Sequence, residues 1–271
     1  MSDDLARIAA ALERLAPAPS KPADWAAAPA YVWHGAARPV ARLVAAPLAL
    51  LKGIDAQKEV VTRNVARLAM GHAAHDMLLW GARGMGKSAL LRAAVLASQD
   101  AEPGRIALVQ VAPESLGTLP DLFADLGKQP RQFLVFIDDL GFEDHDSTGP
   151  RALRSWLEGG IEARPGNVRI AVTSNRRSIV PRHLSEQDDP INPRDSVDDR
   201  LALADRFGLS IGFHTCSQDD YLAIVGGYCT EYGLIWNEGA ALEWSKRRGA
   251  RSGRVAWQFV TELAGRSGTF L

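Results

Sequence analysis

The sequence predicts an α/β fold, in which a parallel sheet carries helices on both faces and is followed by a small all-helical domain. Two observations support this prediction. Between residues 55 and 175, short apolar segments alternate with segments of helical period, a pattern typical of parallel sheets covered on both faces. After Thr215 the periodicity is mainly helical. A chain of 271 residues is long enough for one large domain or two modest ones.

The N-terminal 49 residues are expected to form an arm outside this fold. Residues 3–15 place leucine and isoleucine on one stripe and predict a short helix. Residues 16–30 are rich in proline and alanine, which predicts an extended linker rather than a core element. We therefore predict three parts: an arm over 1–49, an α/β domain over 50–212 and a helical domain over 213–271.

The elements follow one another in a regular order. In the α/β domain the sequence predicts helix 55–70, strand 77–81, helix 87–98, strand 105–112, helix 119–126, strand 133–138, helix 150–163 and strand 168–175. In the helical domain it predicts helices 217–232, 238–248 and 253–266.

Composition excludes several classes of protein. Hydrophobic residues make up 46%, charged residues 23% and the net charge is −1, which excludes a disordered tail, a collagen and a disulfide-stabilised miniprotein. The two cysteines, Cys216 and Cys229, lack the spacing of a zinc site or a disulfide framework. The N-terminus lacks the pattern of a signal peptide, and the apolar stretch 39–51 is too short to cross a bilayer. These features predict a cytoplasmic protein that does not insert into membranes.

One segment carries a phosphate-binding motif. Residues 81–88, GARGMGKS, fit the pattern G-x-x-x-x-G-K-[ST], and they lie between a predicted strand and a predicted helix. Glycines let such a loop wrap a phosphate with its N–H groups, while the helix N-terminus attracts the anion. Lys87 would reach the β- and γ-phosphates, and the Ser88 hydroxyl would ligate Mg²⁺. The expected ATP-binding residues of this segment are Gly81, Ala82, Arg83, Gly84, Met85, Gly86, Lys87, Ser88 and Ala89.

Two later strands end in polar residues that suit this chemistry. The strand at 133–138 ends in Asp138 and Asp139, and the carboxyl ends of parallel strands are where ligands bind in α/β sheets. We expect Asp138 to hold Mg²⁺ and Asp139 to orient or deprotonate the attacking water. Strand 168–175 ends in Thr173, Ser174 and Asn175, and a neutral polar side chain there could hold that water between Asp139 and the γ-phosphate.

Taken together, these motifs resemble those of an AAA+ P-loop ATPase. The segments around the loop, with FIDDLGFE, TSNRR, LADRFGL and SGRVAWQF, are more specifically similar to an uncharacterised bacterial AAA+ family, domain of unknown function 815. The resemblance runs from about residue 50 to 263. It implies an AAA+ core, a helical lid, and an adenine site formed by Leu51, Gly53 and Ile54. It also assigns the water-holding role at the end of strand 168–175 to Asn175, which resembles the sensor-1 residue.

The resemblance also assigns two arginines. Arg206 resembles the finger that a neighbouring subunit inserts, with Arg200 as its rival. Arg254 resembles the sensor arginine of the lid, with Arg251 as its rival. A guanidinium would stabilise the negative charge that develops during phosphoryl transfer.

Two departures and two weaker signals qualify this reading. The acidic strand ends in Asp-Asp instead of the commoner Asp-Glu. The segment AAHDM lacks the asparagines of this family, so the entry to the nucleotide site could differ from that of other members. The acidic run 186–199 is interpreted as an exposed loop. The basic run 246–254, near three tryptophans, could contact DNA, but the neutral overall charge favours a lid surface.

The sequence thus predicts an ATPase that uses ATP and Mg²⁺, acts as a homo-oligomer and remodels an unknown protein client. An ATP-gated assembly switch and a DNA-associated loader are the alternatives. A small-molecule kinase is disfavoured, because the Asp-Asp strand end, the polar strand end and the helical lid suit water better than another acceptor.

Overall fold

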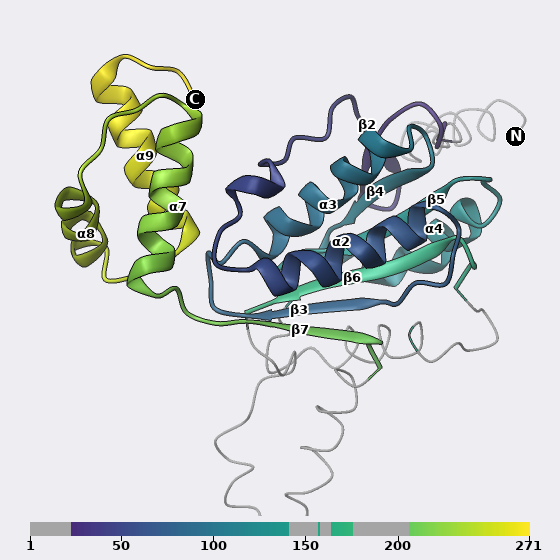
Figure 1. Ribbon diagram of the computed structural model, residues 1–271. Helices are drawn as coiled ribbons and strands as arrows, with labels where there is room; N and C mark the ends of the chain where they lie inside the picture. Colours follow the sequence, from purple (N-terminus) through teal and green to yellow (C-terminus); the bar gives the residue numbers. More distant parts are fainter. Residues whose placement is uncertain (1–22, 141–156, 158–163, 176–205) are drawn as a thin grey trace, which may run out of the picture.

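A seven-stranded sheet forms the centre of the computed structural model, which describes residues 23–140, 157, 164–175 and 206–271 (Figure 1). The strand order is β2-β1-β4-β5-β6-β3-β7, and every neighbouring pair is parallel except the β1–β2 hairpin. The strands are β1 (Ala30–Trp33), β2 (Ala37–Val40), β3 (Met77–Gly81), β4 (Ile106–Val111), β5 (Gln132–Ile137), β6 (Val168–Ser174) and β7 (Leu209–Phe213).

Helices cover both faces of the sheet. Helices α2 (Asp55–Ala69) and α3 (Lys87–Ala101) lie on one face of the sheet. Their apolar side chains pack there with alternate strand residues such as Leu79 and Leu134. On the other face, α4 (Leu119–Leu126) packs with the intervening strand residues, such as Leu78 and Val135. The alternation along each strand therefore feeds two separate apolar clusters, as expected for a sheet buried on both sides. Short 3₁₀ helices, η1 (Leu48–Leu50) and η2 (Pro113–Thr118), precede α2 and α4.

Three C-terminal helices form a separate layer beside the sheet (Figure 1). These are α7 (Gln218–Glu231), α8 (Glu238–Arg247) and α9 (Gly253–Ser267). The side chains of Ser217, Asn237 and Ser252 accept hydrogen bonds from the first turns that follow them, which fixes where the three helices begin. Because α7 directly follows β7, this layer lies beyond the carboxyl ends of the parallel strands. None of the described helices is both long and apolar enough to cross a membrane.

Most elements that the sequence predicts are present within two or three residues of their expected ends. The structure adds β1, β2 and β7, which the sequence did not predict. β7 is short and contains serine and glycine, so its apolar alternation is weak. The predicted helix 3–15 and the acidic run 186–199 lie outside the described residues, as does all but one residue of the predicted helix 150–163.

One expectation is wrong. Residues 23–30 are not an extended linker outside the core, because Trp25 and Ala30 are buried and β1 pairs in parallel with β4. The Trp25 ring packs against Tyr31, with ring centroids 4.7 Å apart, and against the edge of Phe133. Burying large aromatic rings outweighs the extended tendency of a proline- and alanine-rich segment. The hairpin thereby extends the sheet beyond β4.

Candidate functional site

The loop between β3 and α3 folds tightly against the end of β7. Gly81, Gly84 and Gly86 all have positive φ angles. At Gly81 a side chain is sterically excluded, because a Cβ would lie 2.1 Å from the carbonyl oxygen of Phe213. The N–H of Ala82 donates to the same oxygen at 2.9 Å. Gly86, with a φ of 86°, caps α3, so the positive end of that helix opens into the loop.

The side chain of Lys87 lies under this loop and is only 7% exposed. Its ammonium donates to the carbonyl oxygens of Gly81 at 2.8 Å and Ala82 at 2.9 Å, and to Asn175 Oδ1 at 3.4 Å. Burial lowers the pKa of Lys87, and the charges of Asp139 and Asp138 partly oppose that shift. The Lys87 ammonium is therefore a desolvated cation at the N-terminus of α3. Of the remaining loop residues, Met85 is buried, Arg83 is exposed and Ala89 lies in the first turn of α3.

Asp138 follows β5 and lies beside the first turn of α3. Its Oδ1 accepts hydrogen bonds of 2.6 Å from the hydroxyls of Ser88 and Thr173. A hydroxyl and a carboxylate side by side at a phosphate loop fit Mg²⁺, which usually takes one or two carboxylates together with phosphate oxygens and waters. Within the described ranges, no group of three or more His, Cys, Asp or Glu side chains could hold a metal by itself.

Asp139 and Asn175 meet at the ends of β5 and β6. The amide nitrogen of Asn175 donates to Asp139 Oδ1, while its Oδ1 accepts from Lys87. Asp139 has a φ of 51° and is exposed, so its carboxylate is open to solvent at this edge. The structure therefore brings together Lys87, Ser88, Asp138, Asp139 and Asn175 at the carboxyl ends of three neighbouring strands, β5, β6 and β3.

The three residues expected at the adenine site lie between the loop and the helical layer. A Cβ on Gly86 would lie 3.7 Å from Ile54 Cδ1 and 4.0 Å from Leu51 Cδ2. Both of these buried side chains therefore lie directly against the loop. Gly53 has a positive φ, and a Cβ there would lie 2.9 Å from the carboxyl carbon of Asp220 in α7. This segment therefore touches both the loop and the helical layer.

The start of α9 contacts the loop directly. The N–H of Arg254 donates to the carbonyl oxygen of Gly84 at 3.2 Å, and a Cβ on Gly84 would lie 2.9 Å from Ser252 Oγ. The charge of Arg254 also acts on Lys87, whose pKa it lowers. The rival Arg251 is exposed and acts instead on Cys216, at the junction of β7 and α7. Of the two arginines, Arg254 thus has its backbone on the phosphate loop.

Arg206 is not part of this cluster. It lies three residues before β7, and Met77, the first residue of β3, pairs with Leu209. The strands are parallel, so Arg206 lies at their amino ends, about 16 Å along β3 from the loop at about 3.3 Å per residue. Its rival Arg200 lies outside the described residues.

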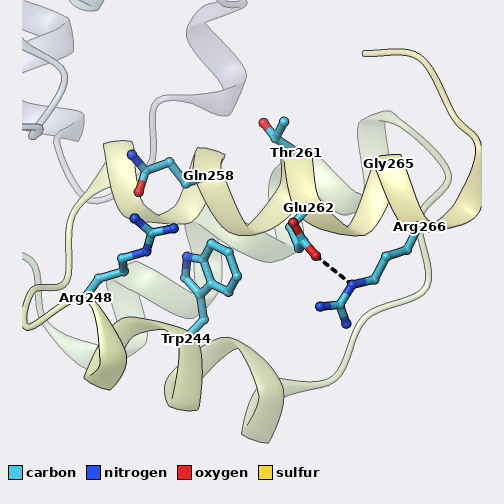
Figure 2. A pocket seen from close by; sticks show the side chains of 7 residues that line it. All are labelled: Trp244, Arg248, Gln258, Thr261, Glu262, Gly265 and Arg266. Carbon is cyan, nitrogen blue, oxygen red and sulfur yellow. Dashed lines mark hydrogen bonds and ion pairs between the residues drawn. The ribbon is translucent and has the colours of Figure 1, made fainter.

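A groove of about 410 Å³ lies elsewhere, between α8 and α9 (Figure 2). The guanidinium of Arg248 stacks over the Trp244 ring, 4.8 Å from its centroid, and Arg266 pairs with Glu262 at 2.8 Å. The groove belongs to the helical layer alone, and none of the predicted site residues lines it.

Sequence reasoning treated Thr173 only as one of three polar residues at a strand end, and it assigned no role to Ser252 or Asp220. Thr173 could have been found from strand alternation, since it lies two residues before Asn175 and therefore on the same face of the sheet. From the helical layer, Ser252 lies against Gly84 of the loop and Asp220 lies against Gly53, across long sequence separations that no local pattern reveals.

Comparison with known proteins agrees with this architecture. The model of the family described as "Protein of unknown function (DUF815)" matches residues 26–267. No curated protein matches. Among solved structures, the Thermotoga maritima RuvB Holliday junction branch migration motor has a TM-score of 0.54 at 16% identity, over 82% of this chain and 66% of that one. The Aeropyrum pernix ORC1 protein in complex with DNA has a TM-score of 0.55 at 15% identity, over 80% of this chain and 61% of that one.

These likenesses concern the fold, and the chain spans about two thirds of the RuvB length. The mostly parallel seven-stranded sheet and its helices agree with the fold of these neighbours. The family model covers nearly the whole chain. The protein therefore belongs to the DUF815 family and has the fold of the AAA+ P-loop ATPases.

Proposed function

We propose that this protein binds Mg-ATP at the loop between β3 and α3 and hydrolyses it to ADP and phosphate. The observation that carries the proposal is the convergence of Lys87, Ser88, Asp138, Asp139 and Asn175 at one edge of the sheet. A buried ammonium and a helix N-terminus attract the phosphates, and two carboxylates lie beside them. Such a set suits transfer of a phosphoryl group to water.

Each residue has a separate task in this reaction. Lys87 turns from the carbonyl oxygens of its own loop to the β- and γ-phosphates. Ser88 and Asp138 hold Mg²⁺, which when bound neutralises charge on the phosphate oxygens. Asp139 accepts a proton from the water whose oxygen forms the new bond to phosphorus, while the bond between phosphorus and the bridging oxygen breaks and ADP leaves. Asn175 orients that water through its amide.

Domain arrangement and assembly are part of the same proposal. The α/β domain would extend over residues 50–212 and the lid over 213–271, with the β1–β2 hairpin joined to the α/β domain. Arg254 would reach the phosphates from the lid, and Leu51, Gly53 and Ile54 would border the adenine. Arg206 lies near the amino ends of the strands, and the loop of its own subunit lies at their carboxyl ends. This separation supports a role for Arg206 as an arginine finger in the site of a neighbouring subunit. Hydrolysis in a cytoplasmic homo-oligomer would then drive motion of the lid against the core and remodel a protein client.

The decisive experiment measures phosphate release from Mg-ATP as the protein concentration rises. We expect turnover per subunit to increase with concentration, Lys87→Ala to abolish ATP binding, and Arg206→Ala to bind ATP but lose hydrolysis by about 10³-fold. The matched controls are Lys128→Ala and Arg105→Ala, which remove exposed cations far from the loop. A wild-type protein that binds ATP but turns it over no faster than Lys87→Ala would instead support an assembly switch.

A DNA-associated ATPase is the second candidate, favoured by one observation. Lys246, Arg247, Arg248, Arg251 and Arg254 are all exposed, and among them an ion pair with a carboxylate is seen at Arg247, with Glu243. Two solved proteins of similar fold are a Holliday junction motor and an ORC1 in complex with DNA. DNA should then stimulate hydrolysis, and Lys246→Glu with Arg247→Glu should remove the stimulation without changing the rate in the absence of DNA. No stimulation at low salt would exclude this candidate.

A further inference from the structure

The hydroxyl of Thr173 joins the two aspartates of the site. It donates to Asp138 Oδ1 at 2.6 Å and accepts from the backbone N–H of Asp139 at 2.8 Å. The side chain is 1% exposed, so water does not compete for either bond. We infer that Thr173 is a positioning residue, which fixes the metal-binding carboxylate and the water-activating carboxylate relative to each other. This inference rests on the function proposed above.

The main chain around Thr173 holds the same turn. Its carbonyl oxygen accepts from the N–H of Leu140 at 2.8 Å, so three hydrogen bonds tie the segment 138–140 to one residue of β6. β5 and β6 are adjacent parallel strands, with Ile137 opposite Val172, which brings Thr173 level with the acidic pair. The position of both carboxylates is thus set from the neighbouring strand.

The backbone of Asp139 shows why this support is needed. Within the described part of the chain, Asp139 is the one non-glycine residue with a positive φ, at 51°. A left-handed conformation is uncommon at a non-glycine residue, although aspartate adopts it more readily than most, and hydrogen bonds to the turn stabilise it. Here the bond from its N–H to Thr173 holds the turn, and the carboxylate consequently faces the amide of Asn175. Without that bond the turn would relax and the carboxylate would move away from the amide.

Only a hydroxyl can perform both tasks from this position. One oxygen must donate to a carboxylate and accept from an N–H, which serine or threonine can do and valine cannot. Valine has nearly the volume of threonine, so it removes both bonds while preserving the packing. Thr173→Val and Thr173→Ser therefore separate the hydroxyl from the shape of the side chain.

The test measures ATP binding by calorimetry, with and without Mg²⁺, and separates kcat from KM. Thr173→Val should bind ATP without Mg²⁺ as the wild type does, but lose about tenfold of the affinity that Mg²⁺ adds. Its KM for Mg-ATP should rise by no more than this loss of affinity, its kcat should fall at least tenfold in addition, and Thr173→Ser should recover most of both losses. The matched control is Thr118→Val, because the Thr118 hydroxyl also donates, to Ser115 O at 2.7 Å, and accepts, from Trp33 Nε1 at 2.8 Å, outside the site.

The outcomes distinguish this inference from the function on which it rests. A wild-type protein that binds no ATP overturns the proposed function and this inference with it. A wild-type protein that binds Mg-ATP normally, with Thr173→Val indistinguishable from Thr118→Val in Mg²⁺ response and kcat, overturns the inference alone. If Thr173→Val does not fold, Thr173→Ala takes its place against Thr173→Ser, with the same expected difference.

Discussion

At the scale of single residues, the site depends on Asn175 serving two neighbours at once. Its amide oxygen faces the Lys87 ammonium, and its amide nitrogen donates to Asp139. A neutral side chain can bridge a cation and an anion in this way because its amide offers both an acceptor and donors. The bridge keeps Lys87 and Asp139 from forming a direct ion pair, which would leave neither charged group for the nucleotide that we propose binds here.

We expect Asn175→Ala to lose hydrolysis while keeping nucleotide binding. Without the amide, Asp139 loses its orientation, so kcat should fall about 10²-fold, which is the lower end of what a positioned base contributes. The affinity for ATP should stay within about threefold, because the loop and Lys87 remain. Phosphate-release kinetics beside equilibrium binding would check this, and a loss of affinity equal to the loss of kcat would contradict it.

At the scale of elements, the segment that precedes β1 is held in place by the partly buried guanidinium of Arg131. Arg131 donates to the carbonyl oxygens of Trp25 at 3.0 Å, Ala28 at 2.8 Å and Ile106 at 2.9 Å. Burial lowers the pKa of this guanidinium, and Tyr31 partly opposes the shift. The arginine thereby joins the segment before β1 to the start of β4.

Replacing Arg131 with methionine should lower the free energy of unfolding by about 3 kcal/mol, because it leaves buried carbonyl oxygens without a charged donor. Urea unfolding measures this, with Arg105→Met as the control at an exposed position of the same sheet. ATP affinity should be unaffected in the folded variant, since the hairpin lies at the far edge of the sheet from β3. Equal unfolding energies for the two variants would be inconsistent with this role.

The junction between β7 and α7 gives a pH-dependent prediction. Burial raises the pKa of the Cys216 thiol to about 11, with Asp220 adding to the shift and Arg251 opposing it. The unfolded chain loses this proton near pH 8.5, so between these values the unfolded state binds fewer protons and stability falls as pH rises.

The expected loss is about 2–3 kcal/mol between pH 8 and pH 11, which follows from about 1.4 kcal/mol per pH unit. Urea unfolding at several pH values would measure it. Cys216→Ala should lose less stability over the same pH range, whatever its stability at pH 8. A loss of the same size in both proteins would argue against the thiol.

Much of this architecture could be predicted from local patterns, and the exceptions have physical causes. Strands β3, β5 and β6 are strongly apolar and lead into Gly81, Asp138 and Asn175, so both the strands and the candidate site at their ends can be inferred from sequence. The segment around Trp25 was misinterpreted because its burial depends on Phe133, more than 100 residues away. The contact of Gly84 with Ser252 is similarly long-range, and periodicity carries no information about it.

At the scale of the whole molecule, the site lies at the carboxyl ends of the parallel strands and Arg206 lies near their amino ends. In a proposed shared site, a Lys87→Ala subunit has a defective loop but an intact Arg206. An Arg206→Ala subunit lacks the arginine but has an intact loop. Mixing Lys87→Ala with Arg206→Ala should restore hydrolysis to a sizeable fraction of wild type, although each variant alone is inactive. Phosphate release across mixing ratios would check this, with the Lys87→Ala, Arg206→Ala double variant as the control that should rescue neither. No recovery at any ratio would contradict a shared site.

The contact between α9 and Gly84 has a mechanical consequence. α9 begins at the phosphate loop and continues for 15 residues, which at about 1.5 Å per residue gives a rod of about 22 Å. If α9 tilted together with α7 and α8, against which it packs, its first turn would be the pivot, because the N–H of Arg254 donates to the carbonyl oxygen of Gly84 there. A tilt of about 10° at that point displaces the last turn by about 4 Å. If a phosphate bound at Gly84 tilted the helical layer by that angle, Ser267 would shift by nearly the spacing between neighbouring strands.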